Sequence, residues 1–218
     1  MMKQAAIPNQ TIWYVAPSLK MAKEICWSNL KEMLYKYNWV QDINETTLTI
    51  HIRKTNSTIS LKGAENFDSL RGSGINFLIL DEFADIDKRT WTEVLRASVA
   101  DTKGRVLMCG TPRGFGNWSY EQYLKGKTDP EWESFQYTTL EGGMVTKEEL
   151  DQAKQDIDIR TFRQEFEGTF ENYAGAVYYN FHPVDSVVDK KIDFSKPVHI
   201  GMDFNVSPMS ACVAQIDK

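Results

Sequence analysis

Two adjacent carboxylates, Asp81 and Glu82, directly follow a short apolar run at residues 77–80. A run of this length after the turn residues 72–74 indicates a strand buried on both faces of a parallel sheet. Because successive residues of a strand point to opposite faces, the two acids leave the strand end in different directions. One carboxylate can then hold a Mg²⁺ ion while the other orients an attacking water, as phosphoryl transfer to water requires.

A second predicted buried strand, residues 105–109, runs into the turn Gly110-Thr111-Pro112. In parallel sheets ligands bind at the carboxyl ends of the strands, so a threonine hydroxyl here could sense a terminal phosphate. Taken alone, the segment is better explained as an ordinary turn after a strand. Its position 30 residues after Asp81, with a predicted helix between, favours the functional interpretation.

Two further residues are candidates for chemistry. Arg71 lies 11 residues before Glu82, on a loop from which a guanidinium could reach a phosphate, although a solvated surface arginine is the commoner case. Asp203 lies within a predicted strand at residues 198–205. A buried acid costs free energy unless it is paired or binds a metal, as in two-metal nucleases, but a structural partner is the commoner explanation.

The elements that would position these residues alternate along the chain. Ser18 can cap the helix after the first strand, and residues 146–149 form a capping box. Strands alternating with helices predict a parallel, doubly wound α/β sheet. The predicted strands, besides those above, are residues 11–16, 47–52, 57–61 and 133–138, of which 47–52 and 57–61 form a hairpin; the predicted helices are residues 19–37, 90–99, 117–125 and 146–157.

Composition limits the class of protein. The chain has 218 residues, 42% of them hydrophobic, and a formal net charge of -5, which together indicate a folded globular protein. No apolar run approaches the ~20 residues of a membrane helix. Its three cysteines are far apart, so we expect buried thiols rather than disulfides or a zinc site. The mild acidity argues against nonspecific wrapping of nucleic acid but leaves a local basic groove open.

In order along the chain, several segments match one family. They are residues 13–23, 70–74, 78–84, 109–112, 164–170 and 200–203. Together they resemble the large terminase subunit of tailed bacteriophages, in which residues 78–82 would be the Walker B segment. The resemblance implies a P-loop NTPase-like (ASCE) parallel sheet with flanking helices, followed by the first strands of a ribonuclease-H-like nuclease domain. The implied domains are an ATPase domain at residues 1–171, a linker at 172–196 and an incomplete nuclease domain at 197–218.

The resemblance also implies residue roles. Asp81 would coordinate Mg²⁺ and Glu82 would activate water, while Thr111 would lie in the coupling motif, with Gly110 beside the nucleotide. Arg71 would be the finger offered to the next subunit of a homo-oligomeric ring. In the nuclease domain, Asp203 would be the first ligand of a divalent metal, Mg²⁺ or Mn²⁺.

The implied function is ATP-driven translocation of double-stranded DNA coupled to endonucleolytic cleavage of concatemeric DNA. ATP with Mg²⁺ would be the cofactor. The implied partners are double-stranded DNA, a small terminase subunit, the portal protein and other copies of the chain, with no membrane. The implied location is the host cytoplasm.

The chain departs from the family pattern at both ends. The phosphate loop ending in Gly-Lys-Ser/Thr would precede residues 11–16, and the only Gly-Lys-Thr, at residues 126–128, follows the Walker B strand and has Glu121 where the first glycine should stand. The remaining nuclease acids would lie beyond Lys218. We therefore expect an internal fragment or a split or truncated product that alone hydrolyses ATP poorly and does not cut DNA.

Two alternatives remain open from the sequence. A helicase-like, DNA-dependent ATPase would share the Asp-Glu pair, but it would need further motifs after Thr111 and none is convincing. A degenerate, non-enzymatic interaction module would keep the sheet without turnover, and the missing phosphate loop favours it for residues 1–218 taken alone.

Overall fold

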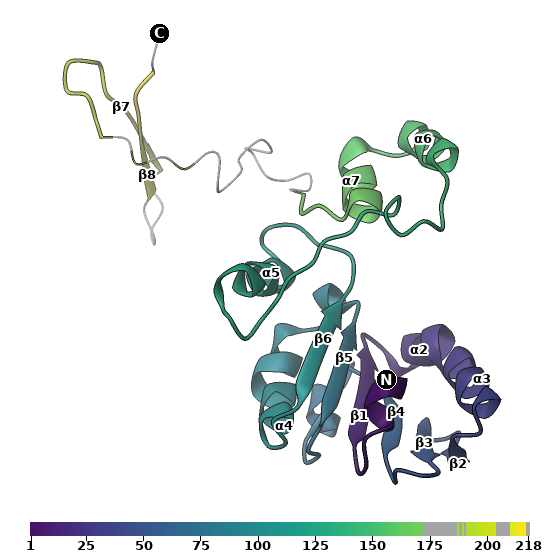
Figure 1. The fold of residues 1–218 in the computed structure, drawn as a ribbon. Helices are drawn as coiled ribbons and strands as arrows, with labels where there is room; N and C mark the ends of the chain where they lie inside the picture. Colours follow the sequence, from purple (N-terminus) through teal and green to yellow (C-terminus); the bar gives the residue numbers. More distant parts are fainter. Residues whose placement is uncertain (172–186, 188, 190, 204–209, 217–218) are drawn as a thin grey trace. The chain divides into compact units, whose positions relative to one another are not determined.

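The computed structural model describes residues 1–171, 187, 189, 191–203 and 210–216. The chain divides into two compact units, Met1–Ala174 and Gly175–Lys218. Each unit is described by itself, and Figure 1 shows the elements of both.

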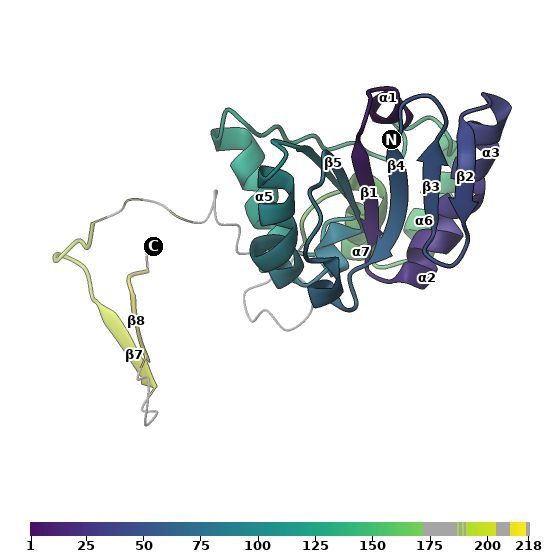
Figure 2. The same ribbon diagram turned by 90° about the horizontal axis from the view of Figure 1, so that it is seen from below.

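A six-stranded sheet forms the centre of the first unit, in the order β2-β3-β4-β1-β5-β6. Four neighbouring strands, β4, β1, β5 and β6, run parallel. The strands β2 and β3 are antiparallel to their neighbours, and Figure 2 shows them beside β4. The strands are β1 (Thr11–Ala16), β2 (Val40–Asn44), β3 (Thr49–Ile52), β4 (Thr58–Gly63), β5 (Phe77–Asp81) and β6 (Arg105–Cys109).

The α/β class is confirmed, but the sheet is mixed rather than wholly parallel, which corrects that part of the prediction. The predicted hairpin of residues 47–52 and 57–61 is confirmed as β3 and β4. Its short connection cannot make the crossover that a parallel pair needs, so the two strands must be antiparallel.

Helical segments connect and cover the strands. The predicted helix at residues 19–37 is one continuous helical stretch that contains a π-helical segment. The helices are α1 (Met2–Ala5), α2 (Leu19–Ala22), α3 (Ser28–Lys36), α4 (Arg96–Ala100), α5 (Trp118–Thr128), α6 (Lys147–Asp156) and α7 (Ile159–Glu167); the π-helical segments are η1 (Lys23–Trp27) and η4 (Thr90–Leu95), and the 3₁₀ segments are η2 (Phe67–Leu70) and η3 (Phe83–Asp85).

Side chains on the two faces of β1 belong to two separate core clusters. Tyr14 packs in the cluster that contains Trp27 and Leu34 from the helical stretch after β1. Trp13 packs in the cluster that contains Trp91, from η4. A strand that is buried on both faces has no polar face to show, which is why the sequence of β1 is almost continuously apolar.

Two expected strands differ from the structure. The strand at residues 105–109 is present as β6, but it is an edge strand of the described sheet, and the side chain of Leu107 is 50% exposed rather than buried. The strand expected at residues 133–138 is wrong, because that segment has no regular secondary structure. An alternating pattern becomes a strand only when a neighbouring strand is there to pair with it.

The second unit contains an antiparallel pair in its described part, β7 (His199–Asp203) and β8 (Ser210–Ala214). The strand expected at residues 198–205 is thus confirmed over 199–203, whereas residues 204 and 205 lie outside the described residues. The predicted linker, residues 172–196, also lies largely outside them. A search of the described helices finds none long and apolar enough to cross a membrane.

Candidate functional site

The predicted pair of acids lies at the carboxyl end of the parallel part of the sheet. Asp81 is the last residue of β5, and Glu82 follows it. In the register between β5 and β6, Asp81 lies opposite Cys109. The turn after β6 consequently begins beside the acids, and the backbone N–H of Thr111 donates a hydrogen bond to Oε2 of Glu82 at 3.3 Å. The structure therefore brings together the two segments that the sequence singled out.

Glu82 adopts a left-handed backbone conformation, with φ 48° and ψ 43°, just before η3. This conformation costs a residue with a Cβ atom about 1–2 kcal/mol relative to the right-handed region. It turns the chain sharply at the end of β5, so the side chains of Asp81 and Glu82 have separate surroundings. Backbone strain of this kind concentrates at functional sites.

Gly110 makes the close approach of the two turns possible. Its φ is +152°, and a Cβ atom placed on it would lie 2.9 Å from Cα of Glu82 and 3.2 Å from Oε2 of the same residue. A contact of 2.9 Å between two carbon atoms is too short for any side chain to be accommodated without a shift. Glycine is therefore needed here for the packing of the β6 turn against Glu82.

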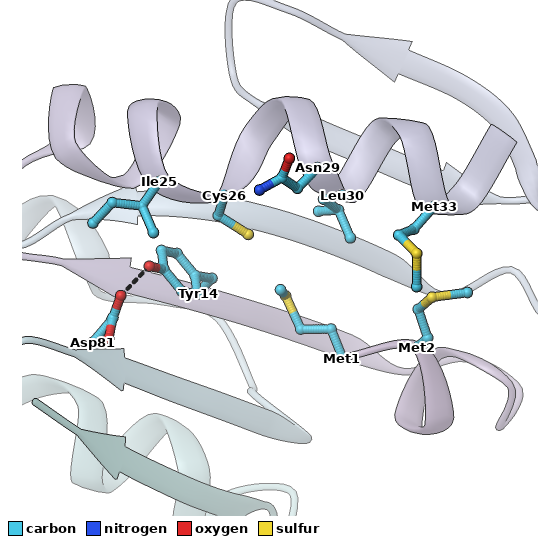
Figure 3. A pocket seen from close by; sticks show the side chains of 9 residues that line it. All are labelled: Met1, Met2, Tyr14, Ile25, Cys26, Asn29, Leu30, Met33 and Asp81. Atoms are coloured by element: carbon cyan, nitrogen blue, oxygen red, sulfur yellow. Dashed lines mark hydrogen bonds between the residues drawn. The ribbon is translucent and has the colours of Figure 1, made fainter. Parts of the chain in front are cut away.

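Both carboxylate oxygens of Asp81 accept hydrogen bonds from neighbouring strands. The Tyr14 hydroxyl, from β1, donates to Oδ2 (Figure 3). The Cys109 thiol, from β6, lies 3.2 Å from Oδ1 and donates to it. Burial, together with the Asp81 carboxylate, raises the pKa of Tyr14 above its usual value and that of Cys109 to about 12. Both groups therefore stay protonated and can act as donors at neutral pH.

A hollow of about 430 Å³ adjoins Asp81 on this face of the sheet. In Figure 3, the helical stretch of η1 and α3 lies on one side of it and the methionines at the start of the chain lie on another. Burial and the nearby Asp81 raise the pKa of the Cys26 thiol, which lines the hollow, to about 11. The lining is mainly apolar and consists of Met1, Met2, Tyr14, Ile25, Cys26, Asn29, Leu30, Met33 and Asp81.

The metal-ligating side chains at this site suit a cation that arrives bound to a nucleotide. Among the described residues, no group of three or more His, Cys, Asp or Glu side chains could hold a metal ion. Mg²⁺ in nucleotide sites is commonly held by one or two carboxylates, with substrate phosphates and water completing its shell. Asp81 fits that requirement, whereas a resident metal held by the protein alone would need more ligands.

Arg71 and Asp203 are the two remaining predicted site residues. Arg71 follows η2, and its exposed guanidinium donates to Oδ1 of Asp68 at 3.0 Å and to the carbonyl oxygen of Glu93 at 3.1 Å. Asp203 belongs to β7, in the second unit. Their predicted roles, as a finger and as a nuclease ligand, stay predictions.

The sequence did not single out three residues that contact the acids of residues 81–85. Tyr14 and Cys109 bind Asp81, and Arg113 donates to both oxygens of Asp85 at 3.0 Å. Arg113 also forms an ion pair with Glu165 of α7 at 3.4 Å. The strand alternation of β1 was the available signal for Tyr14, but its meeting with Asp81 depends on a register that the sequence does not give.

The Gly-Lys-Thr at residues 126–128 is confirmed as unrelated to a phosphate loop. It forms the last turn of α5, where a loop between a strand and a helix would be needed. Lys127 donates to the carbonyl oxygen of Ser134 at 3.1 Å.

Comparison with known proteins gives this arrangement a family. Residues 5–182 match the family model described as the terminase large subunit, T4likevirus-type, N-terminal. The chain therefore belongs to the large-subunit family of phage terminases, and the resemblance inferred from its motifs is confirmed. The matched model describes the N-terminal part of the large subunit, the ATPase domain region of that family.

Individual relatives of known identity belong to the same family. The large terminase subunit of Escherichia phage T5 is 30% identical over 189 residues, covering 84% of this chain and 42% of that protein. The chain thus spans about two fifths of the length of this relative. The large terminase ATPase domain of Thermus phage P74-26 has a TM-score of 0.65 at 25% identity, covering 76% of this chain and 78% of that one. The large terminase of another thermophilic bacteriophage, in complex with ADP, has a TM-score of 0.66 at 14% identity, covering 98% and 54%, which shows likeness of fold.

Proposed function

We propose that this chain carries the catalytic acids of a DNA-packaging ATPase, with Asp81 holding the Mg²⁺ of a bound ATP and Glu82 orienting the attacking water. The proposal rests on one observation: the Asp81-Glu82 turn contacts the Gly110-Thr111 turn at the carboxyl ends of the parallel strands. In sheets of this kind, ligands bind at the carboxyl ends of the strands.

The two acids can divide the work because their surroundings differ. Asp81 is held by side-chain donors from both neighbouring strands, whereas Glu82 accepts from the backbone of the next turn. A bound Mg²⁺ would neutralise charge on the phosphates. The backbone N–H of Thr111 would keep the Glu82 carboxylate aimed at the attacking water, and the polar Thr111 side chain would lie in the coupling segment.

The turn after β6 connects the acids to α7, so it could transmit a conformational change on ATP hydrolysis. Thr111 contacts Glu82, and two residues later Arg113 bridges Asp85 and Glu165. A shift of Glu82 during the reaction would therefore be passed through this turn to α7. In the proposal, this linkage carries the motion from the acids toward the DNA-gripping part of the motor.

The remaining implied roles belong to the same proposal. Arg71, exposed and held by surface contacts, would act as a finger toward the nucleotide of a neighbouring copy in a ring. Double-stranded DNA, a small terminase subunit and the portal protein would be the other partners. Asp203 would be the first metal ligand of a nuclease that cleaves concatemeric DNA.

The test compares two proteins. One is residues 1–218, and the other is the same residues preceded by a phosphate-loop segment taken from the Escherichia phage T5 relative. We expect residues 1–218 alone to hydrolyse ATP near the uncatalysed background, and the fusion to show Mg²⁺-dependent turnover. In the fusion, Glu82→Gln should lower kcat by about 10²–10⁴-fold, the range for a positioned acid–base group, with ATP binding retained.

Two results would contradict the proposal. One is a fusion that binds ATP normally but has the same kcat with and without Glu82→Gln, because the acid would then have no part in the chemistry. The other is a fusion that binds ATP and never turns it over, which would favour the non-enzymatic interaction module. Glu121→Gln, at an exposed acid of α5, serves as the control for a general loss of charge.

A further inference from the structure

We propose that Tyr14 and Cys109 are positioning residues that hold the Asp81 carboxylate in the orientation in which it binds a divalent cation. This inference rests on the proposed function, because it takes Asp81 as the cation ligand. It goes beyond that function by assigning roles to two side chains, from two different strands, that act through their hydrogen bonds to Asp81.

The geometry places one donor on each carboxylate oxygen. The Tyr14 hydroxyl reaches Oδ2 from β1, and the Cys109 thiol reaches Oδ1 from β6 at 3.2 Å. Because β5 lies between these two strands, Asp81 is held from both of its neighbours in the sheet. A carboxylate has about four lone-pair sites, so two donors leave room for a cation on the same group.

Tyr14 can hold the carboxylate firmly because it is itself fixed. Its side chain is 6% exposed and packs in the core cluster with Trp27 and Leu34. Its backbone is paired on both sides, with Leu61 of β4 and Ile79 of β5 in register. The hydroxyl therefore has little conformational freedom, and its hydrogen bond restricts the Asp81 carboxylate to one orientation.

Cys109 contributes from the other side with a weaker donor. It lies directly opposite Asp81 in the β5–β6 register, so the contact is a cross-strand pair rather than a chance meeting of long side chains. A thiol is a poorer hydrogen-bond donor than a hydroxyl. The loss of Tyr14 should consequently matter more to the cation site than the loss of Cys109.

The direction in which cation affinity changes when the Tyr14 hydroxyl is removed distinguishes two roles for that hydroxyl. If the hydroxyl competed with the cation for Oδ2, removing it would raise the affinity for the cation. If the hydroxyl positions the carboxylate, removing it lowers the affinity. Outer partners of metal ligands typically contribute about 10–100-fold to metal affinity.

The experiment titrates the phosphate-loop fusion with Mn²⁺ in the presence of a slowly hydrolysed ATP analogue, which supplies the phosphate ligands, and follows the paramagnetic broadening of individual backbone amide signals. Because each amide reports separately, weak binding at Asp81 is distinguished from binding at other surface acids. The variants are Tyr14→Phe, Cys109→Ala, Cys109→Ser and Asp81→Asn. Tyr35→Phe is the matched control, since Tyr35 lies on α3 and is 61% exposed.

We expect Tyr14→Phe to weaken Mn²⁺ binding at the amides of residues 80–83 by about 10-fold, the lower end for such partners. Cys109→Ala should weaken it less, and Cys109→Ser, which keeps a donor, should restore it. Tyr35→Phe should leave it unchanged. Affinity in Tyr14→Phe that equals or exceeds that of the unmodified fusion would overturn the inference.

The variants also separate this inference from the proposed function. If Asp81→Asn leaves the broadening of residues 80–83 unchanged, the cation site itself is wrong and the proposed function fails with it. If Asp81→Asn abolishes the broadening while Tyr14→Phe does not change it, only the positioning role fails. Should Tyr14→Phe not fold, the Cys109→Ala and Cys109→Ser pair decides, because equal affinity in those two variants would overturn the role of the donor.

Discussion

Glu82 combines a polar contact with a backbone conformation that favours glycine. Its φ of 48° lies in the left-handed region, and its Oε2 atom accepts a hydrogen bond from Thr111. A residue selected only for folding would be glycine or asparagine here. The glutamate therefore holds its position at a cost in stability, which is the pattern expected of a residue kept for chemistry.

That cost can be measured with two substitutions. Glu82→Gly and Glu82→Ala both remove the carboxylate, but only glycine relieves the strain. We expect Glu82→Gly to have a free energy of unfolding about 1 kcal/mol higher than Glu82→Ala, measured by urea denaturation. The usual order in regular structure is the reverse, so an alanine variant that is equally or more stable would show that the left-handed conformation is absent.

The expectation of three buried thiols is wrong, because Cys212 is exposed and Cys26 and Cys109 are half-buried; the two half-buried thiols give a prediction about pH. Burial raises the pKa of Cys26 to about 11 and that of Cys109 to about 12, from an ordinary value near 9. The folded state therefore keeps protons that the unfolded state loses, so this contribution to stability is complete below about pH 9 and is lost as the pH rises through about 11 to 12.

At a pH of about 8.5 the same shifts leave little thiolate at either residue. We expect iodoacetamide to alkylate Cys212, which is exposed, much faster than Cys26 or Cys109, as read by mass spectrometry of timed digests. Urea should abolish the difference. Equal rates in the folded protein would mean that the thiols beside Asp81 are open to solvent.

How far the site could be predicted depends on the residue. The pair at 81 and 82 and the turn at 110 and 111 stood out because an apolar run ended in polar residues, and the structure brings the two turns together. Tyr14 gave no such signal, because an aromatic residue in an apolar strand usually belongs to the core. Its contact with Asp81 depends on the β1–β5 register, which the sequence does not specify.

At the scale of elements, local signals predicted local structure well. Ser18 was expected to cap the helix after β1, and its side chain accepts a hydrogen bond from the backbone N–H of Met21 at 3.1 Å. The predictions were wrong where the structure of a segment depends on the elements that pack or pair with it. Whether β6 is buried depends on what flanks it, and the segment at 133–138 has the alternation of a strand without a pairing partner in the described sheet.

The cap at Ser18 provides a test of element stability. Ser18→Ala should lower the free energy of unfolding by about 1 kcal/mol, because one backbone donor of the first helical turn loses its acceptor. Ser18→Asp keeps an acceptor and should be close to the unmodified chain. Thermal unfolding followed by circular dichroism measures both, and equal losses in the two variants would contradict the capping role.

At the scale of the whole molecule, the two hydrophobic clusters lie entirely within the first unit. Each combines one face of the sheet with the helical segments that cover it. We therefore expect residues 1–171 to fold without the rest of the chain. Their melting temperature should lie within about 4 °C of that of residues 1–218, a shift that corresponds to no more than about 1–2 kcal/mol in a domain of this size.

Calorimetry of the two proteins measures this difference. A single cooperative transition in residues 1–171 is the expected result. A broad, non-cooperative transition would mean that residues 172–218 contribute to the core of the first unit.

The central claim is that the acids at the end of β5 bind the cation of a metal–nucleotide complex. Cleavage of the backbone by Fe²⁺·ATP in the presence of ascorbate tests it most directly, because the iron cuts the chain beside the place where it binds. With the phosphate-loop fusion, we predict cuts within residues 80–83 and 109–112 that require ATP and vanish in Asp81→Asn. Cuts confined to other segments, or unchanged in Asp81→Asn, would contradict the account.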